Sequence, residues 1–422
     1  MKPMTTSKLL ATSFAMTLLA TLNPQLSTFA QGSLTPPGPP APTMKTLAQI
    51  EPRTPISALP FAITQRGSYY LATNLPGGAN GGITISASGV TLDLMGFELA
   101  GGTGSGILIS GSHTNIAIRN GTVRSWGGDG VGAASANNGQ YQDLRLSANG
   151  GNGLNCGPNS TVVNCTAQGN GSDGFIASNG STISGCAAQA NTGNGISAGL
   201  GSIVNGCTAV TNSLHGMSVG DGSTVKDCSA VANTLHGINA GSGSTVIGCT
   251  ARINQQHGIS VSDGSTVKDC TARSNGADGI STAFDCTVTS CTARRNENSG
   301  IVANTGNTVS ECTVAFNAFH GISVETDCQV RHNNCRQNGR TVSNGSGIYV
   351  VGGQNRIDGN NVTDNDYGIQ CLNAGNIVIR NTARANTGVN YVFFSNANAV
   401  GQILGPAVGT FSTSEAWANF NY

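Results

Sequence analysis

The chain contains few charged and few aromatic residues. Lys, Arg, Asp and Glu make up 9% of its 422 residues, and Phe, Trp and Tyr make up 5%. The 20 basic residues balance the 20 acidic ones, so the formal net charge is zero. Nucleic acids and anionic membranes attract proteins through an excess of positive charge, and we therefore expect neither as a partner.

Proline and long apolar runs are also scarce. Eleven of the 13 prolines precede residue 77, and only Pro158 and Pro406 follow. Because proline cannot donate a hydrogen bond to a strand ladder, its absence from 159–405 fits strands that are paired on both edges. After residue 30 no stretch reaches the ~18 apolar residues of a membrane-spanning helix, so we expect no membrane span.

The N-terminal segment 1–30 has the pattern of a secretory signal peptide. Lys2 and Lys8 give a positive end, residues 9–22 are mostly apolar, and the residues before Gln31 suit cleavage. This pattern predicts export, which would place the protein in the periplasm, on the cell surface or outside the cell.

Glycine is abundant, with 60 residues, and much of it belongs to a repeat. A glycine recurs at every 21st position from Gly153 to Gly321, and an asparagine does so from Asn149 to Asn338. An aliphatic column and a cysteine column keep the same step. A constant period indicates one structural unit per repeat, stacked on its neighbours.

Within each unit, residues of one kind are spaced by two positions, which is typical of strands. The apolar runs are short and end at Gly, Ser or Asn, so three strands and three turns fit into one repeat. If each coil closes and rises by one strand spacing, ~4.8 Å, equivalent residues lie above one another. We predict an all-β fold: a single-stranded right-handed parallel β-helix of about 14 coils, because parallel crossovers are almost always right-handed.

The repeat and the composition also predict the domain organisation. One coil near residues 322–347 carries five extra residues, and seven aromatic residues lie in the last 32, where large rings could cover the end of the core. The predicted parts are a signal peptide (1–30), a proline-rich linker (31–43), an N-terminal cap (44–75), the β-helix (76–390) and a C-terminal cap (391–422).

The asparagine in a turn, the Gly-Ile strand start and the Ser-Thr-Val strand resemble the repeats of the pectin-lyase-like superfamily, over about residues 65–395. The resemblance implies the fold but not the chemistry, since this superfamily contains lyases, hydrolases, esterases, epimerases, adhesins and phage spikes. The Asn-Thr-Asp, Asp-Asp and Gly-His-Gly signatures of polygalacturonase-like enzymes are missing from the chain. Calcium is an expected cofactor only if the activity resembles that of the lyases, and no other cofactor is indicated.

The asparagine column is predicted to be structural, with sugar binding as the minor alternative. In a turn, each side chain can bond to backbone groups and to its stacked copies. The members of this ladder are Asn170, Asn191, Asn212, Asn233, Asn254, Asn275, Asn296 and Asn317.

The cysteine column runs from Cys165 to Cys312. Buried thiols are favoured over disulfides, because parallel Cβ vectors suit bridging poorly. One thiolate per coil does not build a tetrahedral cage, so no metal site is predicted. Of the five cysteines outside this column, Cys335 continues the column of small residues that lies two positions after each cysteine. The other four have no predicted place: Cys156, Cys286, Cys328 and Cys371.

Two polar columns are candidate ligand-binding sites. The first lies just before the column glycine, where we expect side chains to face solvent; it contains His215, His236, His257, Asp278 and His320. These residues are either solvated turn residues copied with the repeat, or a strip that binds a metal or donates protons to a sugar chain. The second column is Arg252, Arg273 and Arg294. Its like charges repel one another, and either counter-ions or an acidic ligand would relieve this repulsion. The carboxylates of a uronic-acid polymer would suit the guanidinium groups.

Three functions are consistent with these features. The missing signatures and the loop-free coils favour an exported protein that binds polysaccharide or forms part of a cell-surface or extracellular structure. The alternatives are a polysaccharide lyase, hydrolase or epimerase acting on uronate-containing glycans, and a passive structural or adhesin stalk. The expected partner is a polysaccharide or cell-surface glycan, while catalytic residues and oligomeric state are not indicated.

Overall fold

The computed structural model describes residues 51–79, 81–340, 344–405 and 415–421, and every regular element in them is a β-strand. The chain divides into two units at Pro52, and the unit that begins at Arg53 contains all of these strands. The predicted signal peptide and linker lie outside the described residues. No helix among the described residues has the length and apolar character needed to cross a membrane.

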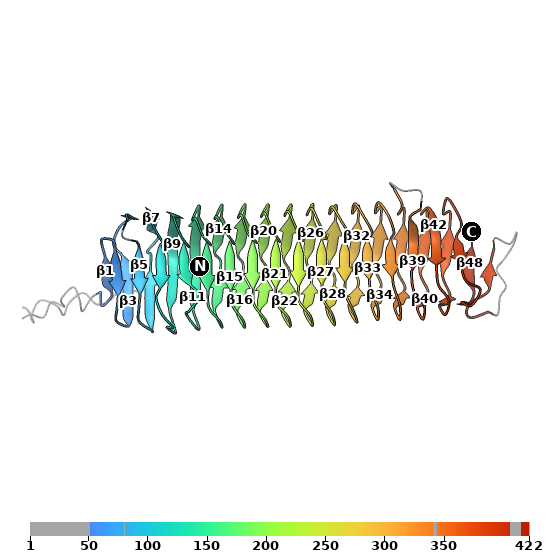
Figure 1. Cartoon of the computed structure of the whole chain (residues 1–422), viewed down its shortest axis with the longest axis horizontal. Helices are drawn as coiled ribbons and strands as arrows, with labels where there is room; N and C mark the ends of the chain where they lie inside the picture. The colour runs from blue at the N-terminus through green and yellow to red at the C-terminus, as the bar shows by residue number, and fades with distance from the viewer. Residues whose placement is uncertain (1–50, 80, 341–343, 406–414, 422) are drawn as a thin grey trace, which may run out of the picture. The chain divides into compact units, whose positions relative to one another are not determined.

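The strands form the coils of a parallel β-helix, stacked along one axis (Figure 1). Nine coils, β12–β14 to β36–β38, follow one another at the constant step of the sequence repeat. They begin with β12 (Leu154–Cys156), β13 (Thr161–Val163) and β14 (Thr166–Gln168), and they end with β36 (Ile322–Val324), β37 (Gln329–Arg331) and β38 (Asn334–Arg336).

The coils at the two ends are less regular. The preceding strands are β1 (Thr54–Ile56), β2 (Phe61–Ile63), β3 (Gly67–Leu71), β4 (Leu75–Pro76), β5 (Ile83–Ile85), β6 (Val90–Asp93), β7 (Glu98–Gly102), β8 (Ile107–Ile109), β9 (Ala117–Trp126), β10 (Val131–Ala133) and β11 (Gln140–Ser147). The following strands are β39 (Ser346–Val350), β40 (Arg356–Asp358), β41 (Asn361–Thr363), β42 (Tyr367–Cys371), β43 (Ile377–Ile379), β44 (Thr382–Arg384), β45 (Tyr391–Phe393), β46 (Ala399–Val400), β47 (Ile403–Leu404) and β48 (Asn419–Asn421).

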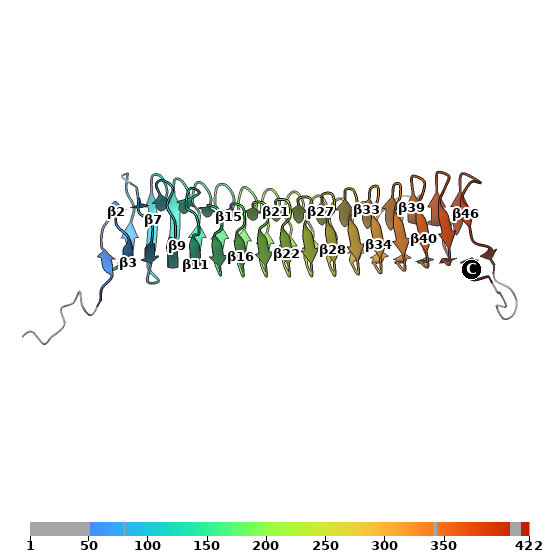
Figure 2. The same ribbon diagram turned by 90° about the horizontal axis from the view of Figure 1, so that it is seen from below.

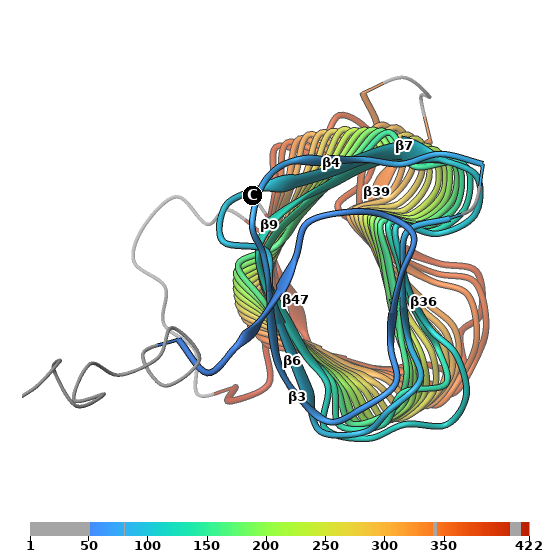
Figure 3. The ribbon, with the colours of Figure 1, turned by 90° about the vertical axis from the view of Figure 1, so that its left-hand side faces the viewer.

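Two sheets wrap around the core, as the side view in Figure 2 and the end-on view in Figure 3 show. The first strand of each coil belongs to a sheet of 16 strands, and the second and third strands belong to a sheet of 32. The described residues therefore form about 16 coils, rather than the 14 predicted. The register matches the sequence period, since Ile259 pairs with Ile280 and Val267 with Val288.

Both predicted caps contain strands that pair with coils. At the N-terminal end, Phe61 of β2 pairs with Ile83, and Gly67 of β3 pairs with Val90. At the C-terminal end, β48 pairs with β44 and β47. Both ends thus continue the hydrogen-bonded ladder of the solenoid.

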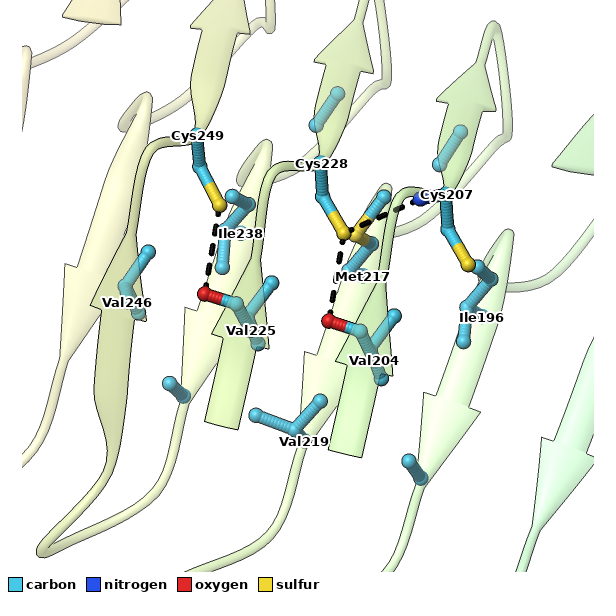
Figure 4. Close-up of a cluster of buried hydrophobic side chains, with 14 of the residues drawn as sticks. Ile196, Val204, Cys207, Met217, Val219, Val225, Cys228, Ile238, Val246 and Cys249 are labelled. Carbon is cyan, nitrogen blue, oxygen red and sulfur yellow. Dashed lines mark hydrogen bonds between the residues drawn. The ribbon is translucent and has the colours of Figure 1, made fainter. Parts of the chain in front are cut away.

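The core contains a ladder of free thiols. All 13 cysteines are free and buried, as the sequence favoured for the column from Cys165 to Cys312. The Cys228 thiol donates to the carbonyl oxygen of Val204 at 3.5 Å and accepts from the backbone N–H of Cys207 at 3.4 Å (Figure 4). Each thiol in this arrangement fills space and connects successive coils without a covalent bond.

The four cysteines without a predicted place also point inward. Cys286 and Cys328 continue the column of small buried residues that includes Ser265, while Cys156 and Cys371 end strands of the 16-stranded sheet. Burial raises the pKa of Cys156 and of Cys371 to about 12, which keeps both as neutral thiols. They are therefore small core residues at positions that accept Ser or Ala elsewhere.

The asparagine column forms an internal hydrogen-bonded ladder. Asn254 is 1% exposed, and its Nδ2 donates to the carbonyl oxygen of Ala230 at 3.2 Å and to Oδ1 of Asn275 at 3.0 Å. Its backbone N–H donates to the same Oδ1 at 3.1 Å. These contacts hold the turn between the third strand and the next coil, and they leave no exposed amide for a sugar.

Candidate functional site

An arginine column lies on the outer face of the third strands. Arg252, Arg273 and Arg294 end β26 (Thr250–Arg252), β29 (Thr271–Arg273) and β32 (Thr292–Arg294). They pair in register, Arg252 with Arg273 and Arg273 with Arg294. The alanine before each arginine is buried, so strand alternation turns the arginine outward. The period had predicted this stack.

A phenylalanine extends the column past its first interruption. At the next coil the column residue is Ala315, which is buried, but the ring of Phe316 stands beside it. The guanidinium carbon of Arg294 lies 4.8 Å from the ring centroid, and that of Arg336 lies 5.2 Å from it. Arg295 approaches the same ring at 5.8 Å. These cation–π contacts hold together arginines that lie two coils apart.

We name Arg252, Arg273, Arg294, Arg295, Phe316 and Arg336 the arginine strip. None of its arginines takes part in an ion pair among the described residues. The Nε atom of Arg294 is buried and has no hydrogen-bond partner. Partial burial, with the charges of Arg295, Arg273 and Arg336, lowers the pKa of Arg294. The strip therefore concentrates positive charge for which the described residues supply no anion.

Arginines elsewhere on the protein behave differently. Asp358 accepts hydrogen bonds from Arg356 and from Arg380, and Asp93 accepts one from Arg119 at 3.1 Å. Both aspartates are largely buried, at 6% and 7% exposure. Arg119, Arg356 and Arg380 thus have a carboxylate partner on the solenoid, whereas the arginines of the strip have none among the described residues.

Beyond Arg336 the outer face of the third strands has a hollow of about 350 Å³. The column residue of the next coil is Thr363, and Arg384 follows one coil later. The residues that line this hollow are Asn334, Arg336, Asn361, Thr363, Thr382 and Arg384.

The histidine column lies across the turn from the arginine strip. His215, His236 and His257 stack with ring centroids 5.0 and 4.9 Å apart. Nδ1 of His215 accepts the backbone N–H of His236, and Nδ1 of His236 accepts that of His257, both at 3.2 Å. An imidazole that accepts at Nδ1 is neutral and carries its proton on Nε2.

Other residues in this column accept hydrogen bonds in the same way. Oδ1 of Asn194 accepts the backbone N–H of His215 at 3.1 Å, and Oδ1 of Asp278 accepts that of Ser299 at 2.9 Å. The common requirement is a hydrogen-bond acceptor close to the backbone of the next coil.

The expectation that this column faces solvent is wrong for two of its members. Asp278 is 6% exposed and His320 is 4% exposed. His320 accepts the backbone N–H of Ser346 at Nδ1, at 3.0 Å, and its ring stacks on Tyr349 at 4.0 Å. The carboxylate of Asp278 also lies 3.3 Å from Nδ1 of His257.

Burial lowers the pKa of His215, His236 and His320. The pKa of His236 falls to about 4 through burial and through the neighbouring His257 and His215. Burial alone lowers the pKa of His320 to about 4, against a small opposing effect of Asp278. The described residues contain no group of three His, Cys, Asp or Glu side chains that could hold a metal ion.

Sequence reasoning missed Arg295, Phe316, Arg336 and Arg384 as members of the charged face. One repeat after Arg294 the column residue is Ala315, and Arg336 follows only after a second repeat. The alanine therefore makes the arginine column look complete at Arg294. The longer coil after Arg336 also shifts the repeat, so Arg384 does not lie at a multiple of 21 residues from Arg336. A search for arginine at two-coil spacing would have found Arg336.

A family model described as the right-handed beta helix region matches residues 105–251 and 238–387. None of the curated proteins compared with the chain matches it. Similar solved structures include the N-terminal fragment of gene product 12 of bacteriophage Phi29, with 11% identity, coverage of 75% of this chain and 76% of that chain, and a TM-score of 0.54.

Two enzymes are also among the similar structures. The A-module of the mannuronan C-5 epimerase AlgE4 of Azotobacter vinelandii has 14% identity, coverage of 69% of this chain and 91% of that chain, and a TM-score of 0.47. The pectate lyase Pel9A has 14% identity, coverage of 52% and 66%, and a TM-score of 0.35. At these identities the likeness concerns the fold alone.

Proposed function

The chain belongs to the family of right-handed β-helix proteins, and we propose that it uses this scaffold to bind an acidic polysaccharide along the arginine strip. The observation that carries the proposal is the set of in-register arginines without an acidic partner. A guanidinium group binds a carboxylate through two parallel hydrogen bonds, which makes carboxylates its natural partners.

The spacing of the strip suits a polymer better than a small ligand. Successive arginines are separated by one strand spacing, ~4.8 Å, which is comparable to the length of a single pyranose residue. A uronate chain lying along the solenoid axis would meet a new guanidinium group at each of the three coils that carry Arg252, Arg273 and Arg294. Many weak contacts of this kind add up through avidity.

A column of threonines beside the arginines offers hydrogen bonds to sugar hydroxyls. Thr250, Thr271 and Thr292 each lie two positions before an arginine and pair in register with one another. Strand alternation puts them on the same outer face as the arginines. The face therefore combines a charge column with a hydroxyl column, which matches the carboxylates and hydroxyls of a uronate polymer.

The proposal can be tested by co-sedimentation of the full chain with polygalacturonate, alginate and neutral polysaccharides, with calcium or with a chelator. We expect binding to the acidic polymers only. The triple variant R252Q/R273Q/R294Q should lose this binding. The variant K268Q, which removes a cation from the second strand of the coil that carries Arg273, should keep it.

Two results would contradict the proposal. One is equal binding by the wild-type chain and the triple variant, and the other is binding to neutral and acidic polymers alike. Unsaturated or shortened products in the same incubations would instead assign a lyase or hydrolase activity.

A further inference from the structure

We propose that the hollow between Arg336 and Arg384 binds one monoanionic sugar residue, carrying either a carboxylate or a sulfate ester. This inference rests on the proposed function of the arginine strip and names a specific subsite at its end. A hollow in line with the strip would receive one residue of a polymer lying along it.

The hollow is built by three third strands in register. Arg336 of β38 pairs with Thr363 of β41, and Thr363 pairs with Arg384 of β44. Thr363 is 7% exposed and forms the floor between the two arginines. The arginines stand two strand spacings apart, roughly 9.6 Å, which leaves room for a sugar ring with a guanidinium group on each side. This is the gap that Phe316 fills two coils earlier.

One wall of the hollow is held in place. The guanidinium of Arg336 lies against the Phe316 ring, and its Nη1 is 3.5 Å from Oε1 of Gln337. An arginine that is already ordered loses less conformational freedom on binding than a free one. Arg384, on the other wall, is exposed and forms no ion pair among the described residues.

The side of the hollow provides groups for sugar hydroxyls. Asn334, Asn361 and Thr382 pair in register there. The only side-chain hydrogen bond of the two amides among the described residues is a long one, from Asn361 Nδ2 to Asn334 Oδ1 at 3.4 Å. The amide nitrogen of Asn334 and the amide oxygen of Asn361 therefore stay available to a ligand.

The charge of the hollow favours a single negative charge. The two lining arginines contribute +2. Asp364 does not line the hollow, but it follows Thr363, is exposed and forms no ion pair among the described residues, so it adds −1 next to the hollow. A net charge of +1 complements a carboxylate or a sulfate ester. A phosphate ester carries nearly two charges at neutral pH and would be repelled by Asp364.

The decisive variant is Thr363→Arg. It fills the hollow while it adds a positive charge, and the same column accepts arginine on three adjacent coils, so the fold should tolerate it. If the hollow binds a sugar, this variant loses the ligand. If charge alone attracts the ligand, this variant binds it more tightly.

The experiment is calorimetric titration of the full chain with trigalacturonate, a sulfated trisaccharide and a phosphorylated sugar. We expect the wild-type chain to bind one or both of the first two and not the third. T363R and R384Q should each weaken that binding at least tenfold. The matched control V210R adds an arginine to the same column, two coils before Arg252 and away from both the strip and the hollow, and should bind the trisaccharide as the wild type does.

The outcomes separate this inference from the function of the strip. Trisaccharide binding that T363R leaves unchanged or strengthens overturns the hollow, even if the polymer still requires Arg252, Arg273 and Arg294. If T363R loses trisaccharide binding and the variant R252Q/R273Q/R294Q still binds the polymer, the result supports the hollow and overturns the strip. A wild-type chain that binds no trisaccharide overturns the hollow as well.

Discussion

The histidine column and the arginine strip are both polar, both repeat with the coils, and lie on opposite sides of the same turn. They differ in what their polar atoms do. Nδ1 of His215 and of His236 already accepts a backbone hydrogen bond from the next coil. The guanidinium groups of Arg252 and Arg273 form no ion pair among the described residues.

This difference shows how to read a repeated polar column in a solenoid. A column whose polar atoms close backbone hydrogen bonds maintains the fold, whatever residue types fill it. A column of charges that the solenoid leaves unpaired is available to a ligand. The following predictions test whether the two columns can be separated in this way.

The largest effect is expected on binding. The variant R273Q/R294Q should bind polygalacturonate roughly 100-fold more weakly, because two charge-assisted contacts of about 1.5 kcal/mol or more each are lost. Its thermal unfolding should stay close to that of the wild type, since neither arginine forms an ion pair among the described residues and the like charges of the strip repel one another. Calorimetry and a thermal melt of the same sample check both parts. A large drop in the melting temperature would show that the strip is structural.

The histidine column should show the reverse behaviour. His236→Ala removes the acceptor for the backbone N–H of His257, which should cost about 1–2 kcal/mol of unfolding free energy. His236→Asn should retain most of the stability, because Asn194 accepts such a bond in the same column. Urea denaturation measures the difference, and polymer binding should stay unchanged in both variants. Equal stability of the two variants would contradict the acceptor role.

Acid should weaken the histidine column and leave the strip charged. The folded-state pKa values of His236 and His320, about 4, lie below the ordinary value of 6.5. Between these values the unfolded chain binds more protons, so stability is complete above pH 6.5 and is lost as the pH falls towards 4. Denaturation curves at several pH values check this. His236→Asn should lose less stability than the wild type between pH 6.5 and 4. An identical loss in both proteins would show that protonation of His236 does not cause the acid sensitivity.

The smallest effect is expected from salt. Raising the ionic strength from low to physiological values should weaken polymer binding several-fold, because exposed charges are screened. Unfolding should hardly respond, since the hydrogen bonds of the histidine column involve neutral rings. Binding that does not depend on salt would indicate contacts other than those of the arginines.

The constant sequence period was sufficient to predict the fold and the register of the arginines, because such a period leaves only one way to stack the coils. Arg273 therefore had to lie next to Arg252 and Arg294. The period could not predict that the imidazole of His236 turns Nδ1 towards the next coil. The signal was present, since Asn152, Asp173, Asn194 and Ser299 share the column and each has an acceptor near its backbone.

Other parts of the site depend on side-chain placement that no period encodes. The ring of Phe316 lies beside Ala315. Arg294 and Arg336 both contact this ring, which links the two arginines. The hollow at Thr363 exists only because no such ring covers that coil. Both features arise from single departures from the repeat.

The most direct test observes the two kinds of side chain in one sample. NMR spectra of the chain with labelled arginine and histidine would follow the arginine Nε–H and imidazole signals as a polygalacturonate oligomer is added. We predict that the signals of Arg252, Arg273 and Arg294 shift, while those of His215 and His236 stay in place. Shifted imidazole signals with unchanged arginine signals would contradict the account.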